Sequence, residues 1–197
     1  ADQIFTRGSA ISNIVASNTG GSVATWEIYP TLPSGLSMVN GVISGTPTVN
    51  QTTAVSYTLY ANNSGGSDSV TFNITINEPV AILGSIADQT FTRGSAITDV
   101  VATNTGGSVA TWEIYPTLPA GLSMTNGVIS GTPTVNQTTA VSYTLYANNS
   151  GGSDSVSFNI IINEPVASLS PIADQTFTRG VTITDIVTTN YGGSVAT

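Results

Sequence analysis

The side chains that could do chemistry in this 197-residue chain are carboxylates and hydroxyls, because the sequence contains no His, Cys or Lys. Three arginines and 11 acids are its only charged side chains. Without the usual general bases and nucleophiles, catalysis would rest on Asp, Glu, Ser or Thr. The acids recur at equivalent places along the chain, which is typical of structural residues. We therefore expect no catalytic residue, no cofactor-binding residue and no enzyme activity in this chain.

Calcium binding is the sharper chemical alternative, since calcium takes six to eight oxygen ligands and carboxylates are prominent among them. The acids nearest the expected module junctions are weak calcium candidates: Glu78, Asp88, Asp68, Asp154, Glu164 and Asp174. No Asp-x-Asp-x-Asp spacing occurs, and each junction offers only two or three acids. The structural alternative is that Asp68 supports a Gly-Gly turn and that Glu78 is a solvated strand end. Both interpretations stay open at this point.

Asparagine side chains offer a second kind of site, for attached sugars. Five positions fit the Asn-x-Ser/Thr pattern of N-glycosylation: Asn50, Asn62, Asn73, Asn136 and Asn148. The first two are expected in loops and at strand ends, and both recur in the next repeat. In a chain so rich in Asn and Thr, chance matches are the alternative explanation.

Tyrosines are the third candidate group, because aromatic rings on a surface stack on sugars or anchor protein interfaces. Strand alternation places Tyr29, Tyr60, Tyr115 and Tyr146 on outward faces. The alternative is that they merely cover neighbouring strands.

The charge balance excludes several classes of partner. The net charge is −8 and charged residues make up only 7% of the chain. Nucleic acids and anionic lipids need clustered Lys or Arg, so neither is expected as a partner. No apolar run is long enough to span a bilayer. A surface of Ser, Thr, Asn and Gly suits a glycan coat or packing against copies of itself, and both indicate an extracellular location.

The chain is an internal repeat. The motif Ala-Asp-Gln-x-Phe-Thr-Arg-Gly begins at residues 1, 87 and 173, a period of 86 residues, and residues 1–80 and 87–166 differ at nine positions. This period suits self-contained small domains. We predict domains at residues 1–79, 80–165 and 166–197, the first lacking its opening strand and the third having only its first strands. We interpret both ends as cuts within a module.

Short strands and tight turns fill each repeat. Alternating apolar and polar residues mark strands around Trp26, around Tyr57 and around Phe72, and no stretch has a helical period. The Asn40-Gly41 and Asn126-Gly127 pairs between short apolar runs predict type I′ hairpins.

About seven short strands around one Trp predict a tandem immunoglobulin-like β-sandwich, an all-β fold. The expected core residues are Trp26, Tyr57 and Leu59, with Trp112, Tyr143 and Leu145 in the second repeat. Tyr57 lies at the position of the tyrosine corner of such sandwiches. Leu59 would replace the usual disulfide cysteine by an apolar contact.

Two pieces of each repeat, Leu-Pro-x-Gly-Leu and Ile-Ser-Gly-Thr-Pro, resemble the immunoglobulin-like (He-PIG) modules of bacterial and archaeal surface proteins, which are related to cadherin-like and dystroglycan-type domains. The resemblance covers most of each 86-residue unit. It implies tandem modules in long adhesins, stalks and some extracellular enzymes, and it implies architecture better than a molecular task.

Three functions follow as hypotheses. The first is an extracellular structural module of a stalk, sheath or filament, with copies of itself as partners. The second is an adhesin module that binds a glycan or a protein partner on a neighbouring cell or a host. The third is a passive spacer attached to an extracellular enzyme. We also expect a strand at residues 166–178 to pair with a neighbouring module or with another chain.

Overall fold

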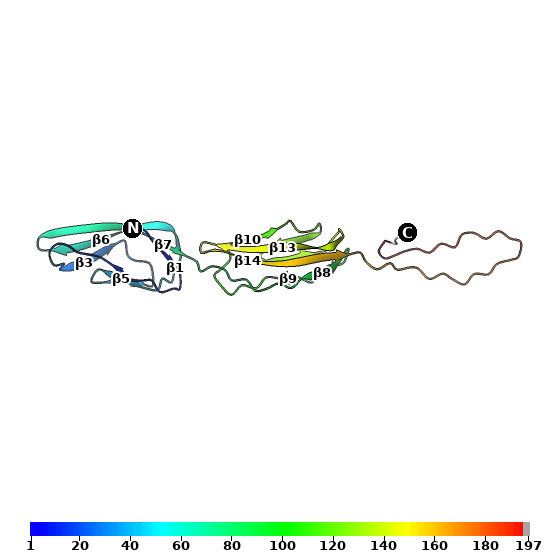
Figure 1. The fold of residues 1–197 in the computed structure, drawn as a ribbon, viewed down its shortest axis with the longest axis horizontal. Helices are drawn as coiled ribbons and strands as arrows, with labels where there is room; N and C mark the ends of the chain where they lie inside the picture. Colours follow the sequence, from blue (N-terminus) through cyan, green and yellow to red (C-terminus); the bar gives the residue numbers. More distant parts are fainter. Residues whose placement is uncertain (195–197) are drawn as a thin grey trace. The chain divides into compact units, whose positions relative to one another are not determined.

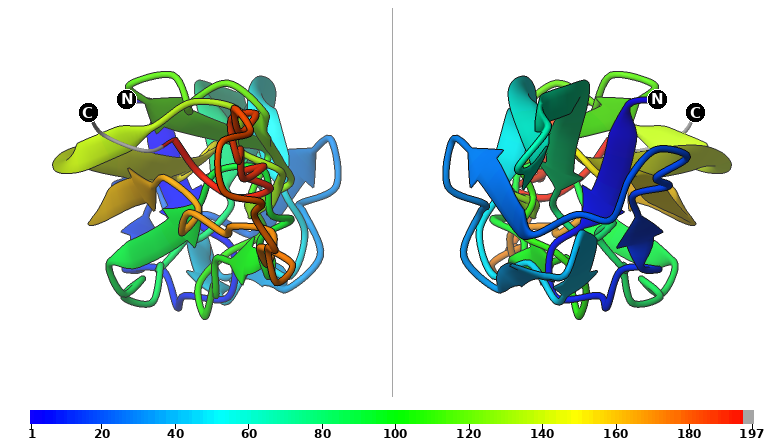
Figure 2. Two further views of the ribbon diagram at one scale, coloured as in Figure 1. Left: turned by 90° about the vertical axis from the view of Figure 1, so that its right-hand side faces the viewer. Right: turned by 90° about the vertical axis from the view of Figure 1, so that its left-hand side faces the viewer.

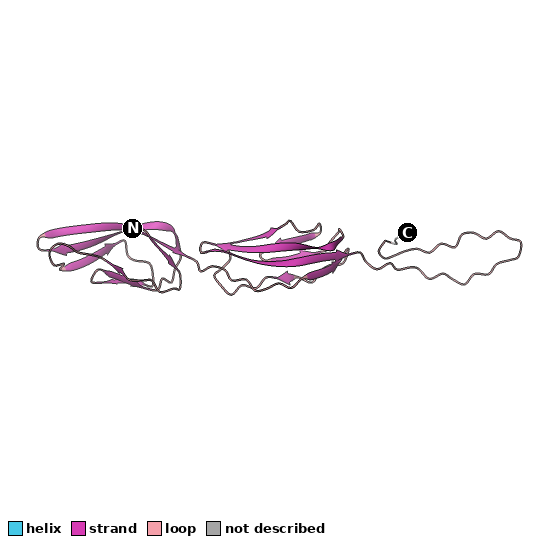
Figure 3. Cartoon of the chain, in the orientation of Figure 1, coloured by secondary structure: helices cyan, strands magenta, loops and turns pink. Residues whose placement is uncertain are grey.

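The computed structural model describes residues 1–194, and these residues contain strands and loops but no helix (Figure 3). The all-β prediction is therefore confirmed. The strands of the first repeat are β1 (Gln3–Thr6), β2 (Ile14–Val15), β3 (Thr25–Tyr29), β4 (Leu36–Val39), β5 (Val42–Gly45), β6 (Gln51–Asn63) and β7 (Gly66–Asn77). Those of the second are β8 (Gln89–Thr92), β9 (Val100–Val101), β10 (Thr111–Tyr115), β11 (Leu122–Thr125), β12 (Val128–Gly131), β13 (Gln137–Asn149) and β14 (Gly152–Asn163).

The first repeat folds into two sheets, as predicted for an immunoglobulin-like sandwich. One has the strand order β1-β7-β6-β3 and the other β2-β5-β4 (Figures 1 and 2). Strand β1 pairs in parallel with β7, and the other pairs are antiparallel. The second repeat has the same two orders, β10-β13-β14-β8 and β11-β12-β9.

The predicted Asn-Gly hairpin joins β4 to β5. Asn40 has a φ of 50° and Gly41 a φ of 74°, the two positive values that a type I′ turn requires. The ring of Trp26 lies against Gly41, where an added Cβ would meet the indole at 2.8 Å. Gly41 is therefore needed both for its backbone conformation and for the room that Trp26 takes.

The core of the first sandwich is aliphatic and aromatic. Its buried residues are Ile43, Tyr57, Leu59, Phe72, Ile74 and Ile76, and Trp26 packs against them half-buried. The rings of Tyr57 and Phe72 lie 6.2 Å apart. The Tyr57 hydroxyl donates to Gln51 Oε1 at 3.1 Å, so its partner is a side chain on its own strand and not the backbone partner of a tyrosine corner.

The second sandwich repeats this core. Tyr143 and Leu145 are buried, as are Ile129, Phe158 and Ile160, and Trp112 is half-buried. The rings of Tyr143 and Phe158 lie 6.4 Å apart. The Tyr143 hydroxyl again bonds its strand neighbour, Gln137, at 3.0 Å.

Residues 164–194 contain no strand and one isolated bridge, between Leu169 and Asn190. Part of the stretch predicted to pair with a neighbouring module or chain pairs instead within its own repeat: Tyr191 N donates to Ser168 O at 2.7 Å, and Gly193 N to Val166 O at 3.1 Å. Tyr191 and Gly193, in the same repeat, supply these partners.

Contacts divide the chain into two compact units, and the division does not follow the repeats. Unit 1 is Ala1–Gly84 with Thr103–Trp112 and Tyr146–Ser155, and unit 2 is the remainder. The loop after β9 and the β13–β14 turn therefore belong to the same unit as the first sandwich. This grouping has a chemical basis, which centres on Glu78.

Candidate functional site

Glu78, the residue after β7, is the one buried charged residue among residues 1–194, with 5% of its surface exposed. Arg7 Nη2 donates to its Oε1 at 2.5 Å and Arg7 Nε to its Oε2 at 3.2 Å. Asn50 Nδ2 also donates to Oε2. From the loop after β9, Ser108 donates its hydroxyl at 2.8 Å and its backbone N–H at 3.2 Å to Oε1. Glu78 is thus a buried carboxylate paired with a half-exposed arginine, and not a solvated strand end.

These donors decide the protonation of the cluster. Hydrogen bonds from Arg7 first, then from Asn50 and Ser108, lower the pKa of the Glu78 carboxyl to about 2, against the opposing effect of burial. The hydrogen bond to Glu78 in turn raises the pKa of the Arg7 guanidinium. The pair is charged at every pH at which the protein would ordinarily be studied.

The backbone that follows Glu78 is held by two loops of the same unit. In the β13–β14 turn, Ser150 Oγ accepts from Glu78 N at 2.9 Å and Asn149 Nδ2 donates to Pro79 O at 2.7 Å. In the loop after β9, Gly107 N donates to Val80 O at 3.0 Å. The backbone groups Glu78 N, Pro79 O and Val80 O are therefore all hydrogen-bonded.

The same segment continues along the two loops. Ile82 N donates to Asn104 Oδ1 at 2.9 Å and Leu83 N to Asp154 Oδ2 at 2.7 Å. Thr105 N donates to Ile82 O at 2.9 Å, and Gly84 N to Thr103 O at 3.0 Å. Residues 78–84 thus lie along two loops, residues 103–109 and 147–154. We call these two loops the filled loop end.

Glycines let this backbone approach so closely. A Cβ on Gly106 would lie 2.6 Å from Ile82 N, and one on Gly107 would lie 2.8 Å from the carbonyl carbon of Pro79. A Cβ on Gly151 would meet the same carbon at 3.0 Å. These glycines serve close backbone approach, since none of them has a positive φ.

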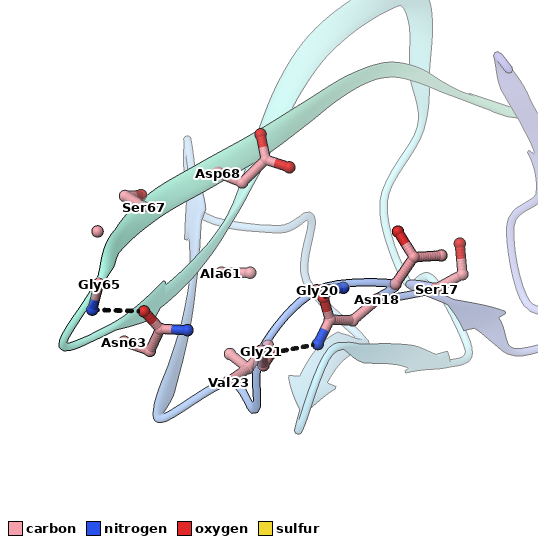
Figure 4. Close-up of a pocket in the computed structure, with 12 residues that line it drawn as sticks. Ser17, Asn18, Gly20, Gly21, Val23, Ala61, Asn63, Gly65, Ser67 and Asp68 are labelled. Atoms are coloured by element: carbon pink, nitrogen blue, oxygen red, sulfur yellow. Dashed lines mark hydrogen bonds between the residues drawn. The ribbon is translucent and has the colours of Figure 1, made fainter.

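The equivalent loops of the first sandwich form a polar hollow of about 460 Å³, lined by residues 17–21, 23, 61, 63 and 65–68 (Figure 4). We call it the open loop end. Asn18 and Asn63 brace its two walls, by hydrogen bonds to Gly21 O at 2.7 Å and from Gly65 N at 2.8 Å. Asp68 lies on its rim (Figure 4).

The Glu78 cluster has a second copy around Glu164. Arg93 Nε donates to Glu164 Oε2 at 3.1 Å, Asn136 donates to the same oxygen, and Ser194 donates its hydroxyl to Oε1 at 3.1 Å. Arg93 first, then Asn136, lowers the pKa of the Glu164 carboxyl to about 2. The cluster is therefore a property of the repeat.

Residues 1–77 and 79–163 each match the He_PIG family, described as "Putative Ig domain". The chain belongs to this family. A comparison with curated proteins found no match.

Solved structures similar to the He_PIG chain are tandem immunoglobulin domains. The N-terminal four Ig domains of Dscam1 isoform 9.44 share 17% identity over 82% of this chain and 43% of that chain, with a TM-score of 0.49. Extracellular domains 3–5 of Drosophila OTK share 17% identity over 82% and 59%, with a TM-score of 0.46. The N-terminal eight Ig domains of Down syndrome cell adhesion molecule share 16% identity over 89% and 27%, with a TM-score of 0.47. The He_PIG chain thus spans less than two thirds of these three structures.

The structure spreads the six calcium candidates among separate contacts. Glu78 and Glu164 bind arginines, and Asp154 accepts the Leu83 N–H. Asp88 accepts from the Asn159 side chain at 2.9 Å and from its backbone N–H at 2.8 Å, and both bonds lower the pKa of Asp88. Asp68 accepts the Ser69 N–H, and Asp174 is exposed. Residues 1–194 bring no three His, Cys, Asp or Glu side chains together as a metal site.

The glycosylation candidates differ in how their amides are used. Asn50 and Asn136 donate to Glu78 and Glu164, and Asn73 donates to Asp2 Oδ1 at 3.0 Å. Asn62 Nδ2 has one long bond, 3.4 Å to Thr25 Oγ1, and Asn148 is half-buried on β13. A sugar on Asn50 or Asn136 would have to displace the glutamate cluster.

Among the outward tyrosines, Tyr29 and Tyr115 are each 74% exposed, at the ends of β3 and β10. Tyr60 lies opposite Glu27 in the β3–β6 pair and is 36% exposed, and Tyr146 is half-buried.

Sequence reasoning missed the arginine and serine partners of Glu78. The available signal was that the only basic residues, Arg7, Arg93 and Arg179, recur with the 86-residue period, as do Asn50 and Glu78. One arginine in each repeat, in a chain with few charges, indicates that it pairs with one of the recurring acids.

Proposed function

We propose that this chain is an extracellular structural segment of a long microbial surface protein, such as a stalk, sheath or filament subunit. The observation that supports this best is the use of the charged residues. Arg7 and Glu78 are both engaged in a contact that joins the end of β7 to Ser108, and the Glu164 cluster repeats that contact. Side chains that could bind a substrate are in this way used to hold the chain together.

Two further features support a structural role. The alternating faces of the sheets carry Ser, Thr and Asn rather than charge, as in the hydroxyl pairs Thr58–Thr71 and Thr144–Ser157 across neighbouring strands. Faces of this kind suit lateral packing between copies of the chain. No side chain in the described clusters is left to act as an acid or base, which supports a module without catalysis.

Immunogold electron microscopy of intact source cells, with an antibody against residues 1–197, tests this proposal. We expect label on extended surface structures. Label confined to the interior of opened cells would contradict it.

Force spectroscopy of the 197-residue chain tests the mechanical part of the role. We expect two cooperative unfolding events, each releasing about 28 nm, because about 80 residues extend by roughly 3.5 Å each. A chain that extends without such events would not suit a stalk.

Adhesion is the second candidate, and the exposure of Tyr29 and Tyr115 at matching positions favours it. Exposed aromatic rings bind sugars and anchor protein partners. A glycan-array signal that the Tyr29→Ala/Tyr115→Ala double variant loses would support adhesion, and a blank array for the parent chain would count against glycan binding.

A further inference from the structure

Two of the nine differences between the repeats fall on one pair of residues that are neighbours in the sheet. Ile4 on β1 lies opposite Thr75 on β7, and at the same place in the second repeat Thr90 on β8 lies opposite Ile161 on β14. The two residue types have thus changed places, and each repeat keeps one isoleucine and one threonine. A requirement that involves both positions at once would explain this exchange.

The pair lies on the outer face of the four-stranded sheet. Ile74 and Ile76 are fully buried, so alternation along β7 places Thr75, and with it Ile4, on the opposite side. The side chain of Ile4 is 71% exposed. Thr90 is exposed too, with the preceding repeat in place, so this exposure is a property of the repeat.

Pairing within the sheet does not require an isoleucine here. Thr58 and Thr71 lie opposite each other on the same face, with their hydroxyls 3.3 Å apart, so this sheet accepts two threonines side by side. An isoleucine that stays in water adds no burial of apolar surface. The requirement therefore comes from a surface that covers this face.

We propose that the outer face of this sheet packs on the same face of a second copy of the chain, related to it by a two-fold axis parallel to the strands. Such an axis places β1 of one copy over β7 of the other, so that Ile4 lies on Thr75 of the second copy. Each contact joins a large side chain to a small one. Thr90 and Ile161 give the same fit in the second repeat, whereas a change at one position alone would place Ile on Ile or Thr on Thr.

The face is large enough for such a contact. Strands β6 and β7 have 13 and 12 residues and form a ribbon about 40 Å long and about 10 Å wide. With the shorter β1 and β3 the face measures roughly 550 Å². Two copies would together bury roughly 1,100 Å², which is above the roughly 1,000 Å² expected of a specific interface.

The polar groups of the face lose little on leaving water, because they are bonded to one another. Thr58 and Thr71 share a hydrogen bond, and Asn73 Nδ2 donates to Asp2 Oδ1 at 3.0 Å. Two acids, Asp2 before β1 and Glu27 on the edge strand β3, lie at the margins of the face. Salt screens the repulsion between such acids of two copies, so association should strengthen as salt is added.

This proposal rests on the structural function given above and names the face through which copies associate. Sedimentation equilibrium of the 197-residue chain tests it, and we expect reversible self-association. The Ile4→Thr/Ile161→Thr variant leaves two threonines at each pair, so it should associate at least about tenfold more weakly, with the circular dichroism of the parent.

Val39→Thr is the matched control. Val39 is 65% exposed on the other sheet, and the second repeat carries Thr125 at its place. This variant should associate as the parent does.

The exchange itself provides a sharper test. In a chain that already carries Ile161→Thr, the change Thr75→Ile should weaken association, because isoleucine then meets isoleucine. Adding Ile4→Thr to that chain should restore it. A role confined to the sheet would not move association in this order.

Disulfide trapping tests the direction of the axis, since the chain has no cysteine of its own. A mixture of Ile4→Cys chains and Thr75→Cys chains under mild oxidation should yield mainly the mixed dimer. An axis perpendicular to the strands would instead give dimers of Ile4→Cys with itself.

Three results would overturn the proposal: a parent chain that is monomeric up to about 1 mM, equal association of the Ile4→Thr/Ile161→Thr variant, or Ile4→Cys dimers in place of the mixed dimer. Each would leave the surface labelling and the force-extension events of the structural function untouched. Loss of the surface label would instead contradict the structural function while the chains still associate.

Discussion

The two glutamate clusters have the same donors but different surroundings. Only 6% of the Glu78 side chain is exposed, whereas 24% of the Glu164 side chain is. Both accept from an arginine, an asparagine and a serine. The residues after Glu78 are held by two loops, however, and in the described chain those after Glu164 are held by one, residues 189–194.

This difference separates two contributions. The arginine, asparagine and serine are enough to lower the pKa of the carboxyl, because that pKa is about 2 in both clusters. The β13–β14 turn, with Ser150 and Asn149, excludes water from Glu78 and fixes the backbone that follows it. Charge pairing and burial thus come from different loops, and mutations should separate them.

The largest expected effect is that of Gly107→Ala. Its Cβ would lie 2.8 Å from the Pro79 carbonyl carbon and 2.9 Å from Glu78 Cγ, and hydrogen bonds from two loops hold that segment in place. We expect a loss of about 2–3 kcal/mol in the free energy of unfolding, measured by urea denaturation.

Gly193→Ala is the matched control. Its Cβ would meet Pro165 and Glu164 at the same 2.8 and 2.9 Å, but a segment held by one loop can move away. Equal losses for the two variants would show that the second loop adds no constraint.

The next effect is that of Glu78→Gln, and it depends on pH. The pKa of Glu78 is about 2 in the folded chain against 4.5 ordinarily, so the stability from its charge is complete above pH 4.5 and is lost as the pH falls toward 2. We expect a loss of about 1–2 kcal/mol at pH 7, reduced because the Arg7 side chain is 37% exposed.

Thermal unfolding between pH 7 and pH 2 checks this. The parent chain and Glu78→Gln should differ at pH 7 and converge as the pH falls to 2, where the parent carboxyl becomes protonated. Glu164→Gln should show the same convergence from a smaller initial difference. A constant difference at every pH would mean that shape, and not charge, makes the contribution of Glu78.

Much of the fold could be predicted from local sequence, because strand alternation and turn chemistry act over a few residues. The Asn40-Gly41 turn and the β6–β7 hairpin are of this kind, and both formed as expected. The Glu78 cluster was not predictable in the same way, because Arg7 lies 71 residues away, and Asn50 and Ser108 lie 28 and 30 residues away. Periodicity could indicate that the arginine and glutamate belong to the repeat, but not that they meet.

The Gly-Gly pairs show a second limit. In the sequence, Asn104-Thr-Gly-Gly-Ser108 is typical of a turn, and in the structure the chain bends at Gly106 and Gly107, with Asn104 Oδ1 accepting from Gly106 N. Its glycines are also the surface against which residues 79–82 lie, and that need comes from a segment more than 20 residues earlier. A loop that only turns the chain and a loop that also packs against another segment have the same composition, so the sequence alone could not distinguish them.

Asn149→Ala is a smaller test of the second loop. Asn149 Nδ2 donates to Pro79 O at 2.7 Å and to Ser108 O at 3.0 Å, whereas Asn63 Nδ2 donates only to the equivalent of the second, Ser22 O, at 3.1 Å. We expect Asn149→Ala to lose about 1 kcal/mol more than Asn63→Ala, the contribution of one hydrogen bond. Urea midpoints of the two variants measure the difference, and equal midpoints would contradict it.

The smallest expected effect separates the two loops most directly. Ser108→Ala removes a hydroxyl donor to the carboxylate, so the pKa of Glu78 should rise from about 2 toward its ordinary value. Ser150→Ala removes only the acceptor of the Glu78 N–H, so that pKa should stay near 2 while stability falls by about 0.5–1 kcal/mol. Carboxyl ¹³C titration by NMR reads the pKa. A rise of the pKa in Ser150→Ala would mean that burial by the β13–β14 turn and ionisation of Glu78 are coupled, and that one loop cannot be changed without the other.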